Sequence, residues 1–174
     1  DNKRIKIVYM SFSGNVRSFT HRLQEYATQQ HHLNNENPLV DLLEISEETL
    51  PTESDSKFFV LLPTYMIGGS RFTPTLTEIL TTPMHDYLES YDNVKCCAGI
   101  IGSGNLTLGK MYVITAKTYA KEYGLPLLDA FESRGTTWDI ERVYKILTDK
   151  RGVLGKDPRV FDDHSGTSGK KEFA

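Results

Sequence analysis

The chain has 174 residues, of which 39% are apolar and 25% charged, a composition that suits one globular domain with a single core. The formal net charge is −3, from 20 basic and 23 acidic residues, so neither nucleic acid nor an anionic membrane is favoured as a partner. The sequence contains no apolar stretch long enough to span a membrane and no recognisable signal peptide. The two cysteines, Cys96 and Cys97, are adjacent, which suits neither a disulfide framework nor a metal site. We therefore predict a cytoplasmic protein.

The first quarter of the chain predicts a strand, a helix and a second strand. Residues 5–10 (IKIVYM) form an apolar run that favours a strand, and residues 39–45 form another. Between them, apolar side chains recur with a helical period over about residues 16–30. The polar stretch over residues 29–37 is expected to be an exposed loop, with the pair His31–His32 on its solvated surface.

The middle of the chain predicts two more strands with a proline-interrupted helix between them. Residues 58–62 (FFVLL) are continuously apolar, as in a parallel strand that is covered on both faces. A glycine-containing loop is expected over residues 64–72, followed by a helix that starts at residues 73–74 and is broken or kinked at Pro83. A second short helix then extends to about residue 90. The fourth strand is predicted over residues 94–101.

The last third predicts a helix, a strand, a helix and a tail. A helix over about residues 110–123 is ended by Gly124, and residues 127–132 form the fifth strand. Thr136 or Thr137 caps the last helix. We expect one domain over residues 1–150 and a flexible tail over residues 151–174. The apolar face of the last helix is expected to consist of Trp138, Ile140, Val143, Tyr144 and Leu147.

Five strands that alternate with helices predict an α/β fold with a right-handed, doubly wound parallel sheet and helices on both faces. We expect the flavodoxin-like strand order 2-1-3-4-5. In such sheets, ligands bind at the carboxyl ends of the strands, near the point where the strand order reverses. The loops after the first, third and fourth strands are the richest in Gly, Ser, Thr and Asn, and this order brings them to one edge. Their convergence predicts one shared ligand site.

The loop after the first strand has the composition of a phosphate site. It leads into a helix, whose first backbone N–H groups lack partners and attract an anion. Gly14 lets the backbone pass close to a phosphate. Because the loop lacks the Lys of a P-loop and the glycines of a dinucleotide site, we expect a monophosphate such as that of flavin mononucleotide (FMN); the alternative is a capped helix after an edge strand. The predicted contacts are Ser11, Phe12, Ser13, Gly14, Asn15 and Val16.

The second and third loops are expected to flank the flavin ring. Their glycines allow backbone groups to approach the N5 and O4 atoms of the ring. Tyr65 offers a ring for stacking, or else packs as a rim aromatic on the next helix, and Leu108 offers an apolar lid. The predicted contacts are Thr64, Tyr65, Met66, Ile67, Gly68 and Gly69 in the second loop, and Ser103, Gly104, Asn105, Leu108 and Gly109 in the third.

The sequence lacks the catalytic residues that other classes of enzyme would need. There is no G-x-S-x-G elbow for a serine hydrolase, and neither cysteine lies in a phosphate loop, as a low-molecular-weight phosphatase requires. The carboxylates Asp55, Glu132, Asp139 and Glu141 do not pair as an acid–base couple in the sequence. We therefore assign no catalytic side chain and no metal, and we expect the redox step to take place on the flavin.

Four stretches of the chain resemble the NrdI family, the flavodoxin-like accessory flavoproteins of class Ib ribonucleotide reductase. They are S-F-S-G-N-V at residues 11–16, P-T-Y with the glycine-rich loop at 63–69, G-S-G-N-x-x-x-G at 102–109, and F-E-S-R-G-T at 131–136. The resemblance extends over about residues 4–148. Val16, which replaces a third hydroxyl, and the near-neutral charge distinguish the chain from ordinary flavodoxins. Leu108 departs from those family members that carry an aromatic residue there.

The resemblance implies that the chain binds FMN and docks on the small, radical-bearing subunit of the reductase. The flavin, reduced by a separate partner, would react with O₂ and supply superoxide or peroxide to a dimanganese site, where a tyrosyl radical forms. Some relatives support a modified tyrosine in metal-free subunits instead. The protein would be an accessory protein rather than a stand-alone enzyme. The open alternatives are a flavodoxin-type one-electron carrier for another reductase and a flavin-free interaction domain. From loop position, the docking face is predicted at residues 68–72, with Gly69, Arg71 and Phe72 as contacts.

Overall fold

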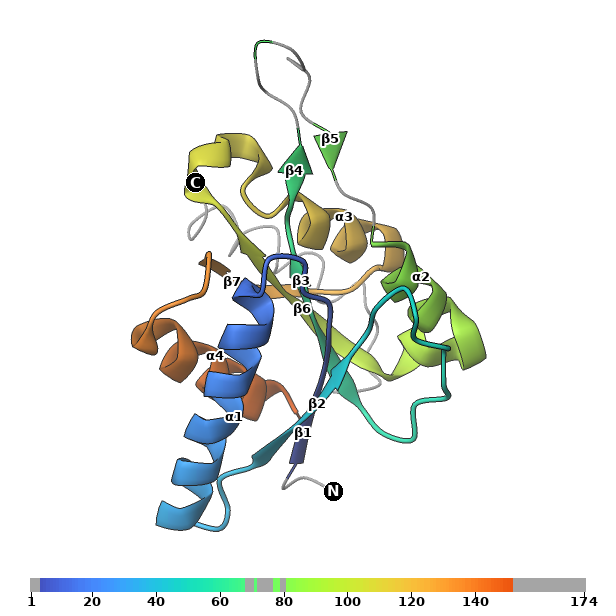
Figure 1. Ribbon diagram of the computed structural model, residues 1–174. Helices are drawn as coiled ribbons and strands as arrows, with labels where there is room; N and C mark the ends of the chain where they lie inside the picture. The colour runs from blue at the N-terminus through green and yellow to red at the C-terminus, as the bar shows by residue number, and fades with distance from the viewer. Residues whose placement is uncertain (1–3, 68–70, 72–76, 79–80, 152–174) are drawn as a thin grey trace.

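The computed structural model describes residues 4–67, 71, 77–78 and 81–151, and within them five strands form one sheet (Figure 1). The order across the sheet is β2-β1-β3-β6-β7, and every neighbouring pair is parallel. Because β6 and β7 are the fourth and fifth strands of this sheet, the predicted order 2-1-3-4-5 and the flavodoxin-like fold are confirmed. The strands are β1 (Arg4–Tyr9), β2 (Leu39–Glu44), β3 (Phe58–Pro63), β6 (Cys97–Gly104) and β7 (Leu127–Glu132).

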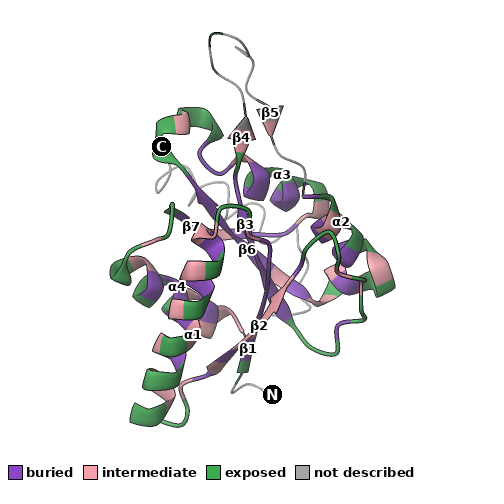
Figure 2. Ribbon diagram, viewed as in Figure 1, coloured by how far each residue is buried: buried purple, intermediate pink, exposed green. Residues whose placement is uncertain are grey.

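Helices cover both faces of the sheet (Figure 1). On one face lie α1 (Asn15–Leu33) and α4 (Thr137–Lys150), and on the other lie α2 (Thr82–Glu89) and α3 (Ile114–Tyr123). Each face has its own cluster of buried apolar side chains against the sheet. The central strand β3 is buried at every position, as its continuous apolar run predicts (Figure 2).

The helix ends follow the sequence signals for caps. Thr136 caps α4 in a capping box, since its hydroxyl oxygen accepts from the Asp139 backbone N–H and the Asp139 carboxylate accepts from the Thr136 N–H. Gly124 ends α3 in the left-handed region at φ 64°. These features confirm the predicted cap and stop. The predicted tail over residues 151–174 lies, except for Arg151, outside the described residues.

The end of α1 was predicted too early. The helix continues to Leu33, so residues 29–33 are helical and not part of a loop. The Gln30 carbonyl oxygen accepts the N–H of Asn34 and so closes the helix. Gln29 and Gln30 have good helix propensity. His32 is exposed as predicted, whereas His31 is half-buried with its Nδ1 2.8 Å from the carbonyl oxygen of Asn37.

The helix predicted from residues 73–74 is wrong where the structure describes it. Strand β5 (Thr77–Glu78) pairs antiparallel with β4 (Met66–Ile67) in a short ribbon that extends beyond the main sheet (Figure 1). Residues 72–76 lie outside the described part. The short helix expected before residue 90 is α2, and Pro83 lies in its first turn, where proline is favourable, rather than interrupting a longer helix.

Three further boundaries differ from the prediction. Strand β6 begins at Cys97 because the preceding residues form a 3₁₀ helix, η1 (Ser90–Cys96), and it continues to Gly104. A second 3₁₀ helix, η2 (Leu106–Met111), delays the start of α3 to Ile114.

Trp138 is 78% exposed rather than on the buried face of α4, because it lies two residues before Ile140, about 200° away around the helix.

Candidate functional site

A pocket of about 240 Å³ lies where β3 and β6 reach their carboxyl ends, with the loops after β1 and β7 beside it. This is the edge of the sheet from which the β4–β5 ribbon extends in Figure 1. Four segments far apart in the sequence therefore meet there. Its lining residues are Ser13, Asn15, Pro63, Thr64, Tyr65, Met66, Ser103, Gly104, Asn105, Leu108 and Ser133. Nine of these eleven belong to the predicted contacts.

The first loop leads into α1 through Gly14, which adopts the left-handed region at φ 88°. Gly14 offers α1 no side-chain cap, so part of the first turn keeps N–H groups available for another acceptor. The Ser11 hydroxyl oxygen accepts the N–H of Arg17 across 3.3 Å, which leaves the earlier N–H groups of the turn to a ligand. Val16 packs into the core with 1% exposure, so only its backbone could contact a ligand.

The second loop contributes Thr64, which lines the pocket and carries a buried hydroxyl. The Thr64 N–H donates to the Ser103 carbonyl oxygen across 2.7 Å, which fixes the loop against β6. The Thr64 Oγ1 atom is buried and has no hydrogen-bond partner among the described residues. Such a buried polar atom is costly unless a partner supplies the missing bond. Beside it, Tyr65 lines the pocket with 41% of its surface exposed.

The third loop passes close to the following segment. A Cβ at Gly104 would lie 1.5 Å from the Tyr112 carbonyl oxygen, so only glycine fits there. The Asn105 side-chain oxygen accepts the Thr107 N–H at 3.0 Å and caps η2. The Glu132 carboxylate accepts the Leu106 N–H at 2.9 Å. These contacts hold η2, which carries Leu108, at the rim of the pocket.

Ser133 lines the pocket but was not among the predicted contacts. Its backbone lies in the left-handed region at φ 53°, although it is not a glycine. Its N–H donates to the Gly104 carbonyl oxygen across 2.8 Å. The only sequence signal for it was its place in the F-E-S-R-G-T stretch at residues 131–136. Pro63, the last residue of β3, was also missed.

Several predicted contacts do not line the pocket. Arg71, predicted as a docking contact, is exposed. Gly68, Gly69 and Phe72 lie outside the described residues, so the docking face stays a prediction. Among the residues whose side chains the structure describes, the predicted flavin contacts that do not line the pocket are Ser11, Phe12, Gly14, Val16 and Gly109. The side chain of Ile67 lies outside the described part of the chain.

The pocket wall is polar without being charged. Every lining residue in the described part of the chain is uncharged. Nearby, Arg17 is paired with Glu44, with 2.8 Å between Nε and Oε1. Burial raises the pKa of Tyr112 to about 12, so the hydroxyl of this neighbour of Gly104 stays neutral. The site thus offers hydroxyls, an amide, backbone groups and one aromatic ring rather than an acid–base couple.

No helix in the described part of the chain is long and apolar enough to cross a membrane.

The family model and the relatives that match this chain all point to the same protein family. The family model described as "NrdI Flavodoxin like" matches residues 7–145. A putative NrdI-like protein of Streptococcus pyogenes is 41% identical over 143 residues, which cover 82% of this chain and 91% of the relative. One of Streptococcus pneumoniae is 37% identical over 153 residues, covering 84% and 94%. Protein NrdI of Mesoplasma florum is 29% identical over 120 residues, covering 66% and 77%. The chain, as its sequence motifs predicted, belongs to the NrdI family of flavodoxin-like proteins.

Proposed function

We propose that this chain binds FMN in the pocket at the carboxyl edge of its sheet and activates the small subunit of class Ib ribonucleotide reductase. The observation that carries the FMN assignment is the buried Thr64 hydroxyl. It has no hydrogen-bond partner within the described part of the chain, and Thr64 lines a pocket built by the three predicted loops. Family membership supports the link to the reductase, because that is the role that the resemblance implies.

The residues present fit a phosphate at the start of α1. The uncapped first turn supplies backbone N–H donors, and its dipole favours an anion. Ser13 and Asn15 line the adjoining pocket and can donate to the phosphate oxygens. No lysine or arginine lines the described pocket, so backbone and hydroxyl donors would carry the phosphate binding.

The second and third loops fit the polar edge of a flavin ring. Thr64 would donate its hydroxyl hydrogen to a ring acceptor, and Tyr65 would stack on the ring face. Leu108 would cover the other side as an apolar contact. When bound, the flavin supplies the electrons that reduce O₂ to superoxide or peroxide. The chain holds and orients the ring, and it contributes no charged side chain from the described pocket wall.

The first test titrates FMN with the full chain and measures binding from the quenching of flavin fluorescence. We expect saturable one-to-one binding and a yellow protein. The reduced protein, mixed in air with Mn²⁺-loaded small subunit, is then expected to generate a tyrosyl radical that electron paramagnetic resonance detects. A protein that takes up no FMN refutes the proposal. FMN binding without radical formation, together with electron transfer to an unrelated reductase, would favour a one-electron carrier instead.

We further propose that the loop around Arg71 contacts the small subunit. Arg71 is exposed and follows the β4 strand of the ribbon that extends beyond the sheet edge. The double variant Arg71→Ala, Phe72→Ala should keep FMN affinity and lose affinity for the small subunit. Unchanged partner binding would remove these two residues from the docking face.

A further inference from the structure

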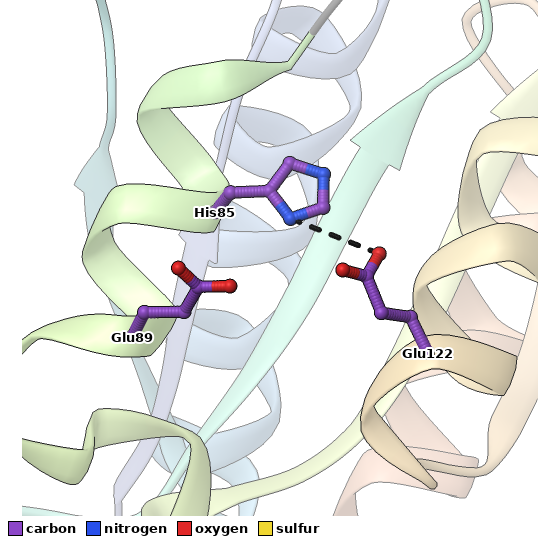
Figure 3. A group of neighbouring side chains, drawn as sticks. All are labelled: His85, Glu89 and Glu122. Atoms are coloured by element: carbon purple, nitrogen blue, oxygen red, sulfur yellow. Dashed lines mark ion pairs between the residues drawn. The ribbon is translucent and has the colours of Figure 1, made fainter.

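A histidine and two glutamates from two helices converge on the face of the molecule that α2 and α3 cover (Figure 3). His85 and Glu89 are four residues apart on α2 and therefore share one side of that helix. Glu122 projects toward them from α3, with 3.9 Å between its Oε2 atom and Nδ1 of His85. One ligand atom from each residue lies within 4.8 Å of the other two. The cluster contains no residue of the proposed flavin pocket.

Neighbouring tyrosines hold the histidine ring in place. The ring stacks on Tyr119, with centroids 4.2 Å apart and planes inclined by 25°. Tyr119 is buried, and its hydroxyl donates to the Thr81 carbonyl oxygen across 2.8 Å, so the stacking platform is itself fixed. The Tyr123 oxygen lies 2.7 Å from Nδ1 of His85. The imidazole therefore points toward the carboxylates before any ligand arrives.

The hydrogen-bond pattern defines where protons lie in the absence of a ligand. The single hydroxyl hydrogen of Tyr123 is donated to the Glu89 carboxylate across 2.9 Å. The Tyr123 oxygen must then accept from the Nδ1–H of His85. A cation that binds Nδ1 displaces the Tyr123 oxygen from this nitrogen, and the ring proton moves by way of water to Nε2, so that the imidazole stays neutral. Tyr123 stays bonded to Glu89 and acts as an outer partner that orients the carboxylate.

We propose that His85, Glu89 and Glu122 form a site for a divalent transition-metal ion, with Zn²⁺ as its expected occupant. One imidazole nitrogen and two carboxylate oxygens are ligands that Zn²⁺ binds at about 2.0–2.2 Å, with water completing the shell. The three ligand atoms lie within 4.8 Å of one another, and both glutamates are exposed, so their side chains have room to rotate toward an ion. A nitrogen ligand disfavours Mg²⁺ and Ca²⁺, which prefer oxygen alone. The bound ion would tie α2 to α3.

Isothermal titration calorimetry of the full chain with ZnCl₂ tests the site. We expect one saturable Zn²⁺ site in the wild type and no comparable heat with MgCl₂. His85→Ala and Glu122→Gln should each weaken Zn²⁺ binding by at least about tenfold, since even outer-sphere changes cost that much at metal sites. Glu122→Gln keeps the size of an exposed side chain and is expected to fold. Circular dichroism checks the fold of each variant.

The matched controls are His32→Ala and Glu141→Gln, which alter exposed residues of the same types on α1 and α4. Both should bind Zn²⁺ as the wild type does. Absence of saturable Zn²⁺ binding, or wild-type affinity in Glu122→Gln, overturns the proposal. Loss of binding in His32→Ala also overturns it, because the ion would then lie on α1. None of these results bears on FMN binding, which is tested separately.

Discussion

The Ser103 hydroxyl donates to the carbonyl oxygen of Ser133 across 2.9 Å and so joins the end of β6 to the loop after β7. Both residues line the pocket, although 29 residues separate them in the sequence. The bond also fixes a backbone that holds a non-glycine residue at positive φ. One wall of the pocket therefore depends on a contact between β6 and the loop that follows the edge strand β7.

Ser103→Ala should weaken that wall. We expect the free energy of unfolding to fall by about 1 kcal/mol, since the Ser133 carbonyl loses a partner, and FMN affinity to fall about fivefold. Urea denaturation and flavin fluorescence measure the two effects. Ser90→Ala is the control, because Ser90 makes a similar bond to the Asp86 carbonyl oxygen far from the pocket. Equal FMN affinities in the wild type and Ser103→Ala would contradict the prediction.

Thr64→Val should change the stability of the FMN-free protein and its affinity for FMN in opposite directions. The variant exchanges a buried hydroxyl, which has no partner among the residues that the structure describes, for a methyl group. The FMN-free protein should therefore become more stable by about 1 kcal/mol. FMN affinity should fall, because the donor to the ring is lost. Thr20→Val is the matched control: the buried Thr20 hydroxyl donates to the Arg17 carbonyl oxygen at 3.0 Å, and its loss should destabilise the protein. Tighter FMN binding by Thr64→Val would exclude Thr64 as a contact.

The strained backbone at Ser133 predicts that one substitution lowers stability and another leaves it nearly unchanged. Ser133→Val should lower the free energy of unfolding by about 1–2 kcal/mol, because a β-branched residue fits poorly at φ 53°. Ser133→Gly should leave stability within about 0.5 kcal/mol, since glycine adopts this conformation freely. Because Ser133 is exposed, loss of side-chain packing should contribute little to the difference in stability between the two variants. Equal stability of both variants in urea would show that the loop relaxes.

Cys97 should be inert in the native protein. Burial raises the pKa of its thiol to about 12, compared with about 8.5 for a free cysteine. At pH 8 only about one thiol in ten thousand would be ionised, and the thiolate is the reactive form. Iodoacetamide at pH 8 should therefore leave Cys97 unmodified until guanidinium unfolds the chain, as mass spectrometry would reveal. Rapid native labelling at Cys97 would be inconsistent with its burial.

The sequence predicted those features that depend on neighbours along the chain. The apolar run of β3, the cap at Thr136 and the glycine stop at Gly124 are local signals, and the structure confirms each. Alternation of strands and helices restricted the topology, because parallel crossovers are right-handed. The errors arose where the local signal was weak, as at the polar end of α1, or where pairing with another segment overrode it, as in β5.

Alone, the sequence determined the family, the fold and the three loops that would meet at one sheet edge, because these follow from local patterns and strand order. Only the tertiary structure decided which atoms face the pocket. The Val16 side chain is buried, the Thr64 hydroxyl has no partner in the described ranges of the chain, and Ser133 joins the pocket from a fourth loop. The tertiary structure also placed Glu122 beside His85. Such pairings depend on how two packed elements are rotated against each other, a geometry that no stretch of sequence specifies by itself.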